Sequence, residues 1–254
     1  MKLLKAMAIA FSIYSKIPVP QFEWKEEDME YMMCFFPWIG GVIGLFFFGW
    51  AVLCEKFAVG NVCYALIGAA IPLMISGGFH VDGYMDTMDA FHSYQSREKK
   101  LEILKDSHIG AFAAIMLALY YMIDIAAISE IHTQKAVSAV AAVFFLARCF
   151  SGIAVMTLQP AKKEGLLYTF ASSAQKVRVK AALYFQAALC VVLMLLVSGW
   201  YGAAAIGAAL LSFFYFKKKS YKELGGITGD TAGFFVTVCE AAAAAAVAMA
   251  GYFL

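Results

Sequence analysis

The densest group of polar side chains in the sequence lies in the segment GGFHVDGYMDTMDA, residues 77–90. Its aspartates, Asp82, Asp86 and Asp89, are spaced i, i+4 and i+7. In a helix their carboxylates therefore share one face, with neighbouring Cβ atoms about 5–6 Å apart. No basic residue stands between them, so a divalent cation is the simplest way to neutralise them, and oxygen ligands favour Mg²⁺, with Mn²⁺ as the alternative, over zinc. The competing interpretation is a solvated acidic helix end.

Two neighbours of this segment extend the candidate site. We expect His80 to hydrogen-bond a substrate phosphate or to transfer a proton rather than to bind metal. Asp106 follows Lys105 at the expected start of a helix, where the helix dipole favours a carboxylate and free N–H groups can hold an anion. Asp106 is thus either a further metal ligand or an ordinary feature of a helix N-terminus. As a ligand, it would help to hold metal ions on a bridging phosphate, an arrangement used for displacement at phosphorus.

A glycine-rich segment, LGGITGDTAG at residues 224–233, precedes the last apolar run of the chain. Glycine permits backbone N–H groups to approach phosphate oxygens closely, although an ordinary turn between two helices has a similar composition. Candidate phosphate-binding residues in this segment are Gly225, Gly226, Thr228, Gly229 and Asp230.

Three charged residues lie inside apolar runs, where an unpaired charge is costly. Arg148 stands about ten residues from one end of its run, close enough for its long side chain to reach an anionic substrate. Asp124 and Glu240 lie toward the opposite ends of their runs, which favours structural pairing or exposure at the membrane interface.

The elements that position these residues are predicted to be membrane helices. The 254 residues are 63% hydrophobic and 15% charged, with a mean hydropathy of +0.74 and a net charge of +2. These values exclude a water-soluble globule and give no reason to expect nucleic acid as a partner. We predict an all-α, polytopic bundle of about seven transmembrane helices. The expected spans are 32–53, 61–79, 110–128, 136–158, 181–198, 200–216 and 232–254.

The fifth and sixth spans are separated only by Ser198, Gly199 and Trp200, and one long helix there would reverse the orientation of the last span. The distribution of lysine and arginine favours seven spans. Seventeen basic residues then fall on one side and two, Lys56 and Lys135, on the other. Because basic residues concentrate in cytoplasmic loops, we expect the C-terminus outside and these segments inside: the N-terminus, 80–109, 159–180 and 217–231.

The whole chain, residues 1–254, is predicted to form one integral membrane domain. Residues 1–20 are expected to begin with a helix that lies in the membrane interface, because apolar residues recur there at helical spacing and Pro18 and Pro20 follow. The segments 80–109 and 217–231 are expected to be cytoplasmic loops that carry the active site.

The motifs, taken in order, resemble the cobalamin synthase family, the adenosylcobinamide-GDP ribazoletransferases. The resemblance rests on GGFHVDGYMDTMD at 77–89, LEILKDSHIG at 101–110, KEGL at 163–166 and LGGITGDTAG at 224–233, with IPVP at 17–20 and FPWIG at 36–40. It covers nearly the whole chain. The departures are His108 in place of the usual Arg, Ala90 in place of a common Gly, and Phe234 in place of a small residue, so an anion contact at His108 would depend on pH.

The resemblance implies a membrane transferase that joins α-ribazole, or its 5′-phosphate, to adenosylcobinamide-GDP with release of GMP. Mg²⁺ would be held by Asp82, Asp86, Asp89 and Asp106, and either His80 or Asp89 would deprotonate or orient the attacking hydroxyl. The phosphates of the GDP portion would be held by Lys105, Arg148 and residues 225–230.

The resemblance also implies the inner membrane of a prokaryote as the location, with the lipid bilayer and the two small-molecule substrates as partners. It leaves open a homo-oligomer or an association with other corrinoid enzymes. Two alternative functions are another membrane phosphotransferase, of the CDP-alcohol type, and a cation-coupled transporter. The acidic cluster at the membrane boundary and the lack of an internal repeat count against the transporter.

Overall fold

The protein is described by a computed structural model that covers residues 2–20, 23, 25–162, 167–168, 172 and 174–253. Within these residues the regular structure is helical, apart from one isolated bridge between Pro160 and Ile227. The α-helices are α1 (Lys2–Tyr14), α2 (Phe36–Lys56), α3 (Asn61–Ser76), α4 (Phe79–His92), α5 (Arg97–Ile103), α6 (Ala111–Ile128), α7 (Gln134–Thr157), α9 (Lys176–Ser198), α10 (Trp200–Leu224) and α11 (Gly229–Gly251). Two short 3₁₀ helices, η1 (Glu26–Met29) and η2 (Met32–Cys34), join α1 to α2.

Each of the seven expected spans coincides with a helix. In the described part of the chain, five helices, α2, α6, α7, α9 and α11, are long and apolar enough to cross a membrane, and counting α3 together with α4 as one bent span gives six. In the remaining helix, α10, glycine, serine and tyrosine residues and the lysines near its C-terminal end lower the hydropathy. The count is therefore close to the predicted seven, and the all-α membrane fold is confirmed.

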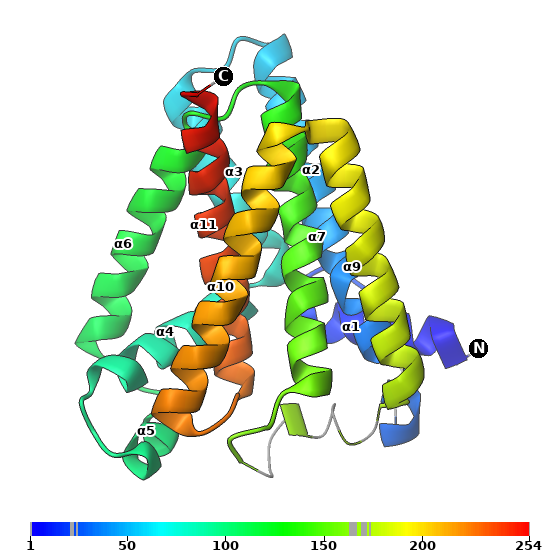
Figure 1. Cartoon of the computed structure of the whole chain (residues 1–254), viewed down its shortest axis with the longest axis vertical. Coiled ribbons are helices and arrows are strands. Elements are labelled where there is room, and N and C mark those ends of the chain that lie inside the picture. Colours follow the sequence, from blue (N-terminus) through cyan, green and yellow to red (C-terminus); the bar gives the residue numbers. More distant parts are fainter. Residues whose placement is uncertain are drawn as a thin grey trace.

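The two arms of the α9–α10 hairpin are separate helices, as the basic-residue distribution indicates. Gly199 joins them with φ 56° and ψ −121°, a conformation that residues with a side chain rarely adopt. The chain reverses at this point and α10 lies beside α9 (Figure 1).

A sharp bend between α3 and α4 positions the acidic segment. Gly77 and Gly78 have φ values of 66° and 85°, and the axis of α4 departs from that of α3 by 97°. The apolar residues of this pair lie mainly in α3. The polar helix α4, with three aspartates and two histidines, lies outside the apolar spans.

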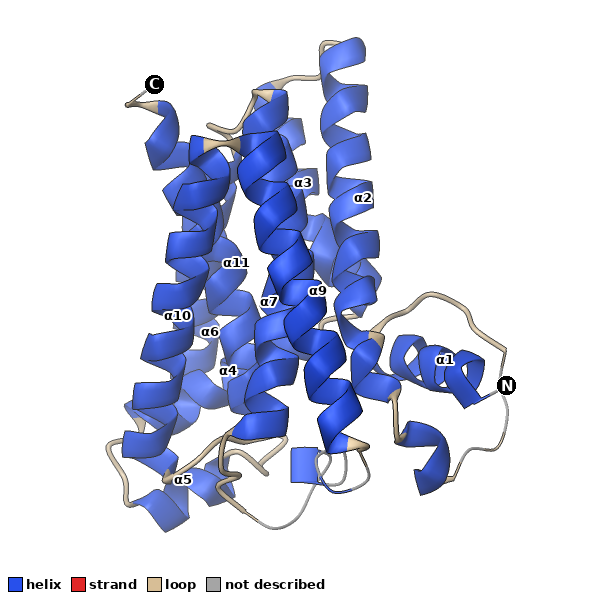
Figure 2. Ribbon diagram, turned by 45° about the vertical axis from the view of Figure 1, so that its right-hand side comes forward, coloured by secondary structure: helices blue, strands red, loops and turns tan. Residues whose placement is uncertain are grey.

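Helices α7 and α11 form the centre of the bundle, since most of the residues of each are buried. Helix α2 approaches α7 very closely, because a side chain at Gly40 or Gly44 would collide with the backbone carbonyl groups of Phe144 and Ala141. Helix α1 crosses the direction of the bundle and packs beside its lower part (Figure 2). Its Ala6, Ile9, Ala10 and Tyr14 are buried, while Leu3 and Leu4 remain exposed, as expected for a helix at a membrane interface.

The segments rich in lysine and arginine gather at one end of the molecule. Helices α4 and α5 and the described parts of the α7–α9 and α10–α11 connections lie at this end, and the C-terminus lies at the other (Figure 1). The structure differs from the expected loops in its local form. Residues 79–92 and 97–103 are helical. Helix α10 continues through the lysines to Leu224, because no glycine or proline occurs between Lys217 and Gly225.

Candidate active site

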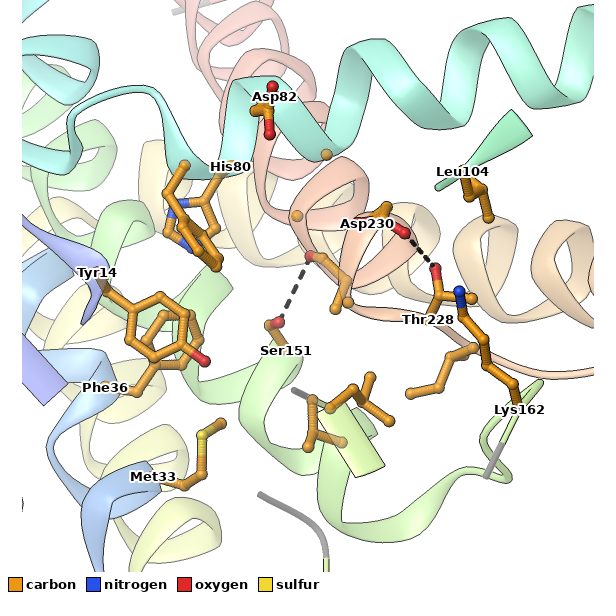
Figure 3. A pocket seen from close by; sticks show the side chains of 18 residues that line it. Tyr14, Met33, Phe36, His80, Asp82, Leu104, Ser151, Lys162, Thr228 and Asp230 are labelled. Atoms are coloured by element: carbon orange, nitrogen blue, oxygen red, sulfur yellow. Dashed lines mark hydrogen bonds between the residues drawn. The ribbon is translucent and has the colours of Figure 1, made fainter. Parts of the chain in front are cut away.

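A cavity of about 340 Å³ opens among α1, α2, α4, α7 and α11 at the basic end of the bundle (Figure 3). Its lining divides into two parts. Tyr14, Phe36 and His80 lie together on one side, while Thr228, Asp230 and Lys162 lie on the other (Figure 3). The cavity thus combines an aromatic end with a polar end, which suits a ligand that has an aromatic part and a charged part.

His80, in the first turn of α4, stands within the aromatic end. The centroid of its ring lies 6.1 Å from that of Tyr14 in a stacked arrangement, 5.7 Å from that of Phe36 and 5.6 Å from that of Phe79. The side chain is 5% exposed, and neither ring nitrogen has a hydrogen-bond partner within the described part of the chain. Burial, with a smaller contribution from the nearby Arg148 charge, lowers the pKa of His80 well below its usual value. The imidazole is therefore neutral at neutral pH.

The polar end is built by the start of α11. Thr228 caps this helix: its Oγ1 accepts a hydrogen bond from the N–H of Thr231 at 3.1 Å, and the Thr231 hydroxyl accepts one from the N–H of Thr228 at 2.8 Å. The Thr228 hydroxyl also donates to Asp230 at 3.3 Å. Gly229 has open space where a side chain would stand. The backbone at this end is therefore both ordered and accessible.

Helix α4 lies directly against the start of α11 because both contribute glycine. A Cβ atom at Gly83 would lie 2.8 Å from the carbonyl oxygen of Asp230, and one at Gly233 would lie 3.2 Å from that of His80. This contact brings Asp82, in α4, and Asp230, in α11, to the same cavity. Two motifs almost 150 residues apart in the sequence thus form one site.

Asp86 stands one helical turn beyond Asp82, and the negative charges of the neighbouring aspartates act on its carboxyl group. Its pKa rises to about 7, because the side chain is partly buried and because Asp82, Asp230 and Asp89 carry negative charge nearby. Among the described residues, no group of three histidine, cysteine, aspartate or glutamate side chains converges as a preformed metal site. The carboxylates are close enough to repel one another without forming a closed cage.

Asp89 faces away from the cavity toward the start of α6. Its two carboxylate oxygens accept hydrogen bonds from the backbone N–H groups of Gly110 and Ala113 at 2.7 and 2.8 Å. These are unpaired groups at a helix N-terminus, which a carboxylate satisfies well. The aspartates expected to share one site therefore have different surroundings. Asp82 lines the cavity, whereas Asp89 stabilises the start of α6.

Asp106 and Lys105 lie in the connection between α5 and α6 and are absent from the cavity lining. His108 Nδ1 lies 2.6 Å from the Asp106 carboxylate, and this hydrogen bond lowers the Asp106 pKa. Both side chains of this pair are largely exposed. Neither residue lines the cavity, although Leu104, which directly precedes Lys105, does.

Arg148 is a core residue of α7. Its side chain is 1% exposed, and its Nη1 donates to Glu240 of α11 at 2.6 Å and to the carbonyl of Phe144 at 2.7 Å. The predicted structural pairing of Glu240 is confirmed. Arg148 does not line the cavity, because this ion pair holds its guanidinium inside the bundle. Asp124, 6% exposed, is also buried.

Gly225 and Gly226 shape the turn rather than line the cavity. Gly225 ends α10 with φ 71°, the left-handed conformation common at the end of a helix. A side chain at Gly226 would collide with the backbone at Gln159 and Pro160, where the chain forms its isolated bridge. The KEGL segment, residues 163–166, lies outside the described residues.

Sequence reasoning about the site missed several cavity residues. Lys162, Ser151, Tyr14 and Phe36 all line the cavity. Lys162 was detectable, since it directly precedes KEGL in a basic loop on the same side as the aspartates. Phe36 opens the FPWIG motif, but its residue type does not indicate a site. Tyr14 and Ser151 carry no such signal, because an aromatic or small residue in an apolar helix looks like ordinary core.

Comparison with known proteins decides between the alternative functions. A model of the cobalamin-5-phosphate synthase family matches residues 6–248. The chain belongs to this family. The match includes all the described residues that line the cavity, and it confirms the resemblance seen in the motifs.

Relatives within the family cover nearly the full length of the chain. An adenosylcobinamide-GDP ribazoletransferase of Lachnoclostridium phytofermentans is 44% identical over 250 residues, which are 98% of this chain and 95% of that protein. Proteins of the same name from Clostridium botulinum (strain Alaska E43) and Clostridium perfringens (strain SM101) are 31% and 29% identical, over 94% and 93% of this chain and 94% of each relative. No solved structure matches the chain.

Proposed function

We propose that this protein is an adenosylcobinamide-GDP ribazoletransferase. A hydroxyl oxygen of α-ribazole, or of its 5′-phosphate, forms a bond to the phosphorus attached to cobinamide. The bond from that phosphorus to the oxygen of GMP breaks, GMP leaves with the electron pair, and the hydroxyl proton passes to a base. The products are adenosylcobalamin, or its phosphate, and GMP.

The observation that carries this proposal is the meeting of α4 and α11 at one cavity. The aspartate motif and the glycine-rich motif, through which the chain resembles its family, come together at the Gly83–Asp230 contact. The start of α11 offers backbone N–H groups and a helix dipole to a phosphate, and Lys162 lines the same end of the cavity. A diphosphate held there lies next to the acidic side chains.

The donor set at this end fits Mg²⁺. Asp82, Asp86 and Asp230 offer carboxylate oxygens, and burial together with the negative charges of Asp82, Asp230 and Asp89 raises the pKa of Asp86 to about 7. Mg²⁺ commonly uses one or two carboxylates together with substrate phosphates and water, so a closed protein cage is unnecessary. When bound, the ion would neutralise charge on the phosphate oxygens and on the departing GMP. Asp82 is the best candidate ligand because it lines the cavity.

The structure favours His80 over Asp89 for the contact with the attacking hydroxyl. His80 lies in the cavity with both ring nitrogens unpartnered in the described structure, and a neutral imidazole can accept a proton. Asp89 already accepts two backbone hydrogen bonds at the start of α6. We therefore assign His80 the role of orienting or deprotonating the hydroxyl, and Asp89 a structural role.

The reaction itself tests the proposed function. Purified protein is incubated with adenosylcobinamide-GDP, α-ribazole and Mg²⁺, and released GMP and adenosylcobalamin are measured. We expect the two products in equal amounts, loss of turnover on chelation of divalent ions, and recovery on addition of Mg²⁺. Absence of both products under all these conditions would contradict the proposal.

The variant Asp82→Asn tests the acidic site. Replacement removes one negative charge with little change in volume, and we expect turnover to fall by about 100-fold or more, a typical loss when a group that stabilises transition-state charge is removed. Glu102→Gln is the matched control, since Glu102 is exposed and pairs with Lys99 in α5. Equal turnover in the two variants would remove Asp82 from the site.

We also propose that the basic end of the bundle faces the cytoplasm of a prokaryotic cell, with the C-terminus outside the inner membrane. The proposal is supported by the gathering of the basic segments at one end (Figure 1) and by the bias of lysine and arginine toward cytoplasmic loops. This orientation places the cavity where nucleotides are made.

A further inference from the structure

The aromatic end of the cavity has no role in holding phosphate or metal. We propose that it binds the base of the acceptor nucleoside, and that Tyr14, Phe36, Phe79 and His80 select a planar, apolar base of the benzimidazole type. This inference rests on the proposed function, since it places one of the two substrates of that reaction. It adds the residues that determine which base is accepted.

The size of the cavity favours the nucleoside over the corrinoid. Its volume of about 340 Å³ is near the lower limit of small-molecule sites, which range over about 300–1,000 Å³. One nucleoside fits a site of this size. A corrinoid that carries GDP is far larger, so most of it must lie outside the cavity and present only its diphosphate to the polar end.

The aromatic rings pack against one another and form a continuous wall of the cavity against which a flat group can lie. The ring centroids of Tyr14 and Phe36 are 4.6 Å apart, and those of Tyr14 and Phe79 are 4.9 Å apart with nearly perpendicular planes. Met33 also lines this end, and its flexible thioether adapts well to an aromatic face. A planar base gains both burial of apolar area and ring stacking from such surroundings.

The hydrogen-bonding capacity of His80 matches a base with one acceptor nitrogen. A buried polar atom without a partner is costly, and both nitrogens of this 95% buried side chain lack one in the described structure. A neutral imidazole has one donor and one acceptor. A benzimidazole joined to ribose through one nitrogen keeps a second nitrogen that can accept from the imidazole N–H. A ribose hydroxyl can then donate to the other nitrogen of His80.

Guanine fits the aromatic end less well. Its edge carries several donors and acceptors, and the Asp230 carboxylate that could accept from its donors lies at the polar end (Figure 3). A base seated beside His80 also leaves the ribose nearer to Asp82 and Asp230, both of which line the cavity. The hydroxyl is thereby directed toward the diphosphate held at the start of α11.

Direct binding of α-ribazole tests this assignment without catalysis. Titration calorimetry is performed on the full-length purified protein with α-ribazole alone. We expect binding at one site, weakened about tenfold in Phe36→Leu through loss of ring stacking, and unaffected by added GMP. The matched control is Phe47→Leu on the same helix, whose side chain is 0% exposed and packs on Phe144, outside the cavity. Competition between GMP and α-ribazole would overturn the assignment.

A second variant covers the case in which Phe36→Leu does not fold. Phe79 is 37% exposed, so Phe79→Leu removes a cavity ring at a smaller cost in stability; Phe46→Leu, at a 59% exposed position of α2, is its control. In steady-state assays we expect Phe79→Leu to raise the KM for α-ribazole several-fold and to leave the KM for adenosylcobinamide-GDP unchanged. The reverse pattern would overturn the inference. If α-ribazole binds only after the other substrate, calorimetry with α-ribazole alone shows no binding. The steady-state assays then test whether the aromatic end binds the base.

A change of base gives an independent measurement. We expect a nucleoside with adenine as its base to have a higher KM than α-ribazole in the unaltered protein, and this preference to shrink in Phe36→Leu and Phe79→Leu. An undiminished preference would place base selection elsewhere. Failure of this inference differs from failure of the proposed function, because in the first case turnover persists without the expected changes in KM, whereas in the second no GMP is released.

Discussion

At the scale of single residues, Asp86 shows how neighbours alter a carboxylate. Burial and the charges of Asp82, Asp230 and Asp89 raise its pKa to about 7, so in the metal-free protein it is mostly protonated at pH 6 and mostly ionised at pH 8. A bound cation would have to displace this proton. Metal affinity should consequently increase with pH across this range.

We predict that the affinity for Mg²⁺ in the absence of substrates is about tenfold higher at pH 8 than at pH 6, since the ionised fraction of a group with a pKa of about 7 changes by that factor. Calorimetric titration with Mg²⁺ at the two pH values measures the difference. Asp86→Asn should bind more weakly and show a flatter dependence on pH. A dependence that persists unchanged in this variant would assign the titration to another group.

The buried pair of Arg148 and Glu240 leads to a different kind of prediction. Removing one partner leaves an unpaired charge in the core, which costs about 3–5 kcal/mol. We expect Arg148→Met to lower the thermal unfolding temperature strongly. Combining it with Glu240→Leu should restore much of the loss, because no charge is then left unpaired. Thermal unfolding of the two variants in detergent measures this recovery.

The activity of the double variant separates the two roles considered for Arg148. The side chain is paired inside the bundle and does not line the cavity. A stable double variant should therefore keep an unchanged KM for adenosylcobinamide-GDP. A large increase in that KM, with stability restored, would return Arg148 to the substrate site.

At the scale of elements, the active site depends on the contact of α4 with α11. Glycine at 83 and 233 lets the two helices approach so closely that even one added methyl group at Gly83 would press on the backbone of Asp230. The bend at Gly77 and Gly78 directs α4 toward this contact. The position of Asp82 relative to the start of α11 thus depends on the bend at Gly77 and Gly78 and on the glycines at 83 in α4 and 233 in α11.

We predict that Gly83→Ala separates the two helices, destabilises the protein by about 1–3 kcal/mol as overpacking does, and reduces turnover more than it reduces stability. Gly49→Ala in α2 is the matched control, since no atom lies within 4 Å of the added Cβ there. Thermal unfolding and GMP release are measured for both. Normal turnover in Gly83→Ala would show that the close approach is not required for the reaction.

At the scale of the whole molecule, the distribution of charge predicts the orientation in the membrane. Cys63 is exposed in the first turn of α3, at the end of the bundle opposite the cavity. Four of the other cysteines are buried and Cys34 is half-buried. We predict that a membrane-impermeant maleimide labels Cys63 in intact cells, and that Cys63→Ser abolishes the labelling.

A cysteine at the basic end provides the matched control. Ser107 is exposed in the connection between α5 and α6. In a Cys63→Ser background, Ser107→Cys should be labelled only after the cells are permeabilised. Labelling of Ser107→Cys in intact cells, together with no labelling of Cys63 in intact cells that carry the unaltered protein, would reverse the proposed orientation.

The fold class, the segments that become membrane helices and the family could all be derived from the sequence. These properties depend on the local run of apolar residues, on the distribution of basic residues and on the order of motifs, all of which are present along the chain itself. The spacing of the aspartates placed them on one face only if residues 79–92 were helical, and the structure rather than the spacing established that helix. Only the tertiary structure decided which aspartate faces the cavity, because that depends on the direction of α4 after the Gly77–Gly78 bend and on which helix start each carboxylate meets. Only the tertiary structure showed that Tyr14, Phe36 and Lys162 line the cavity. They come from segments far apart in the sequence, and an aromatic or basic side chain becomes part of a site only when such segments pack together.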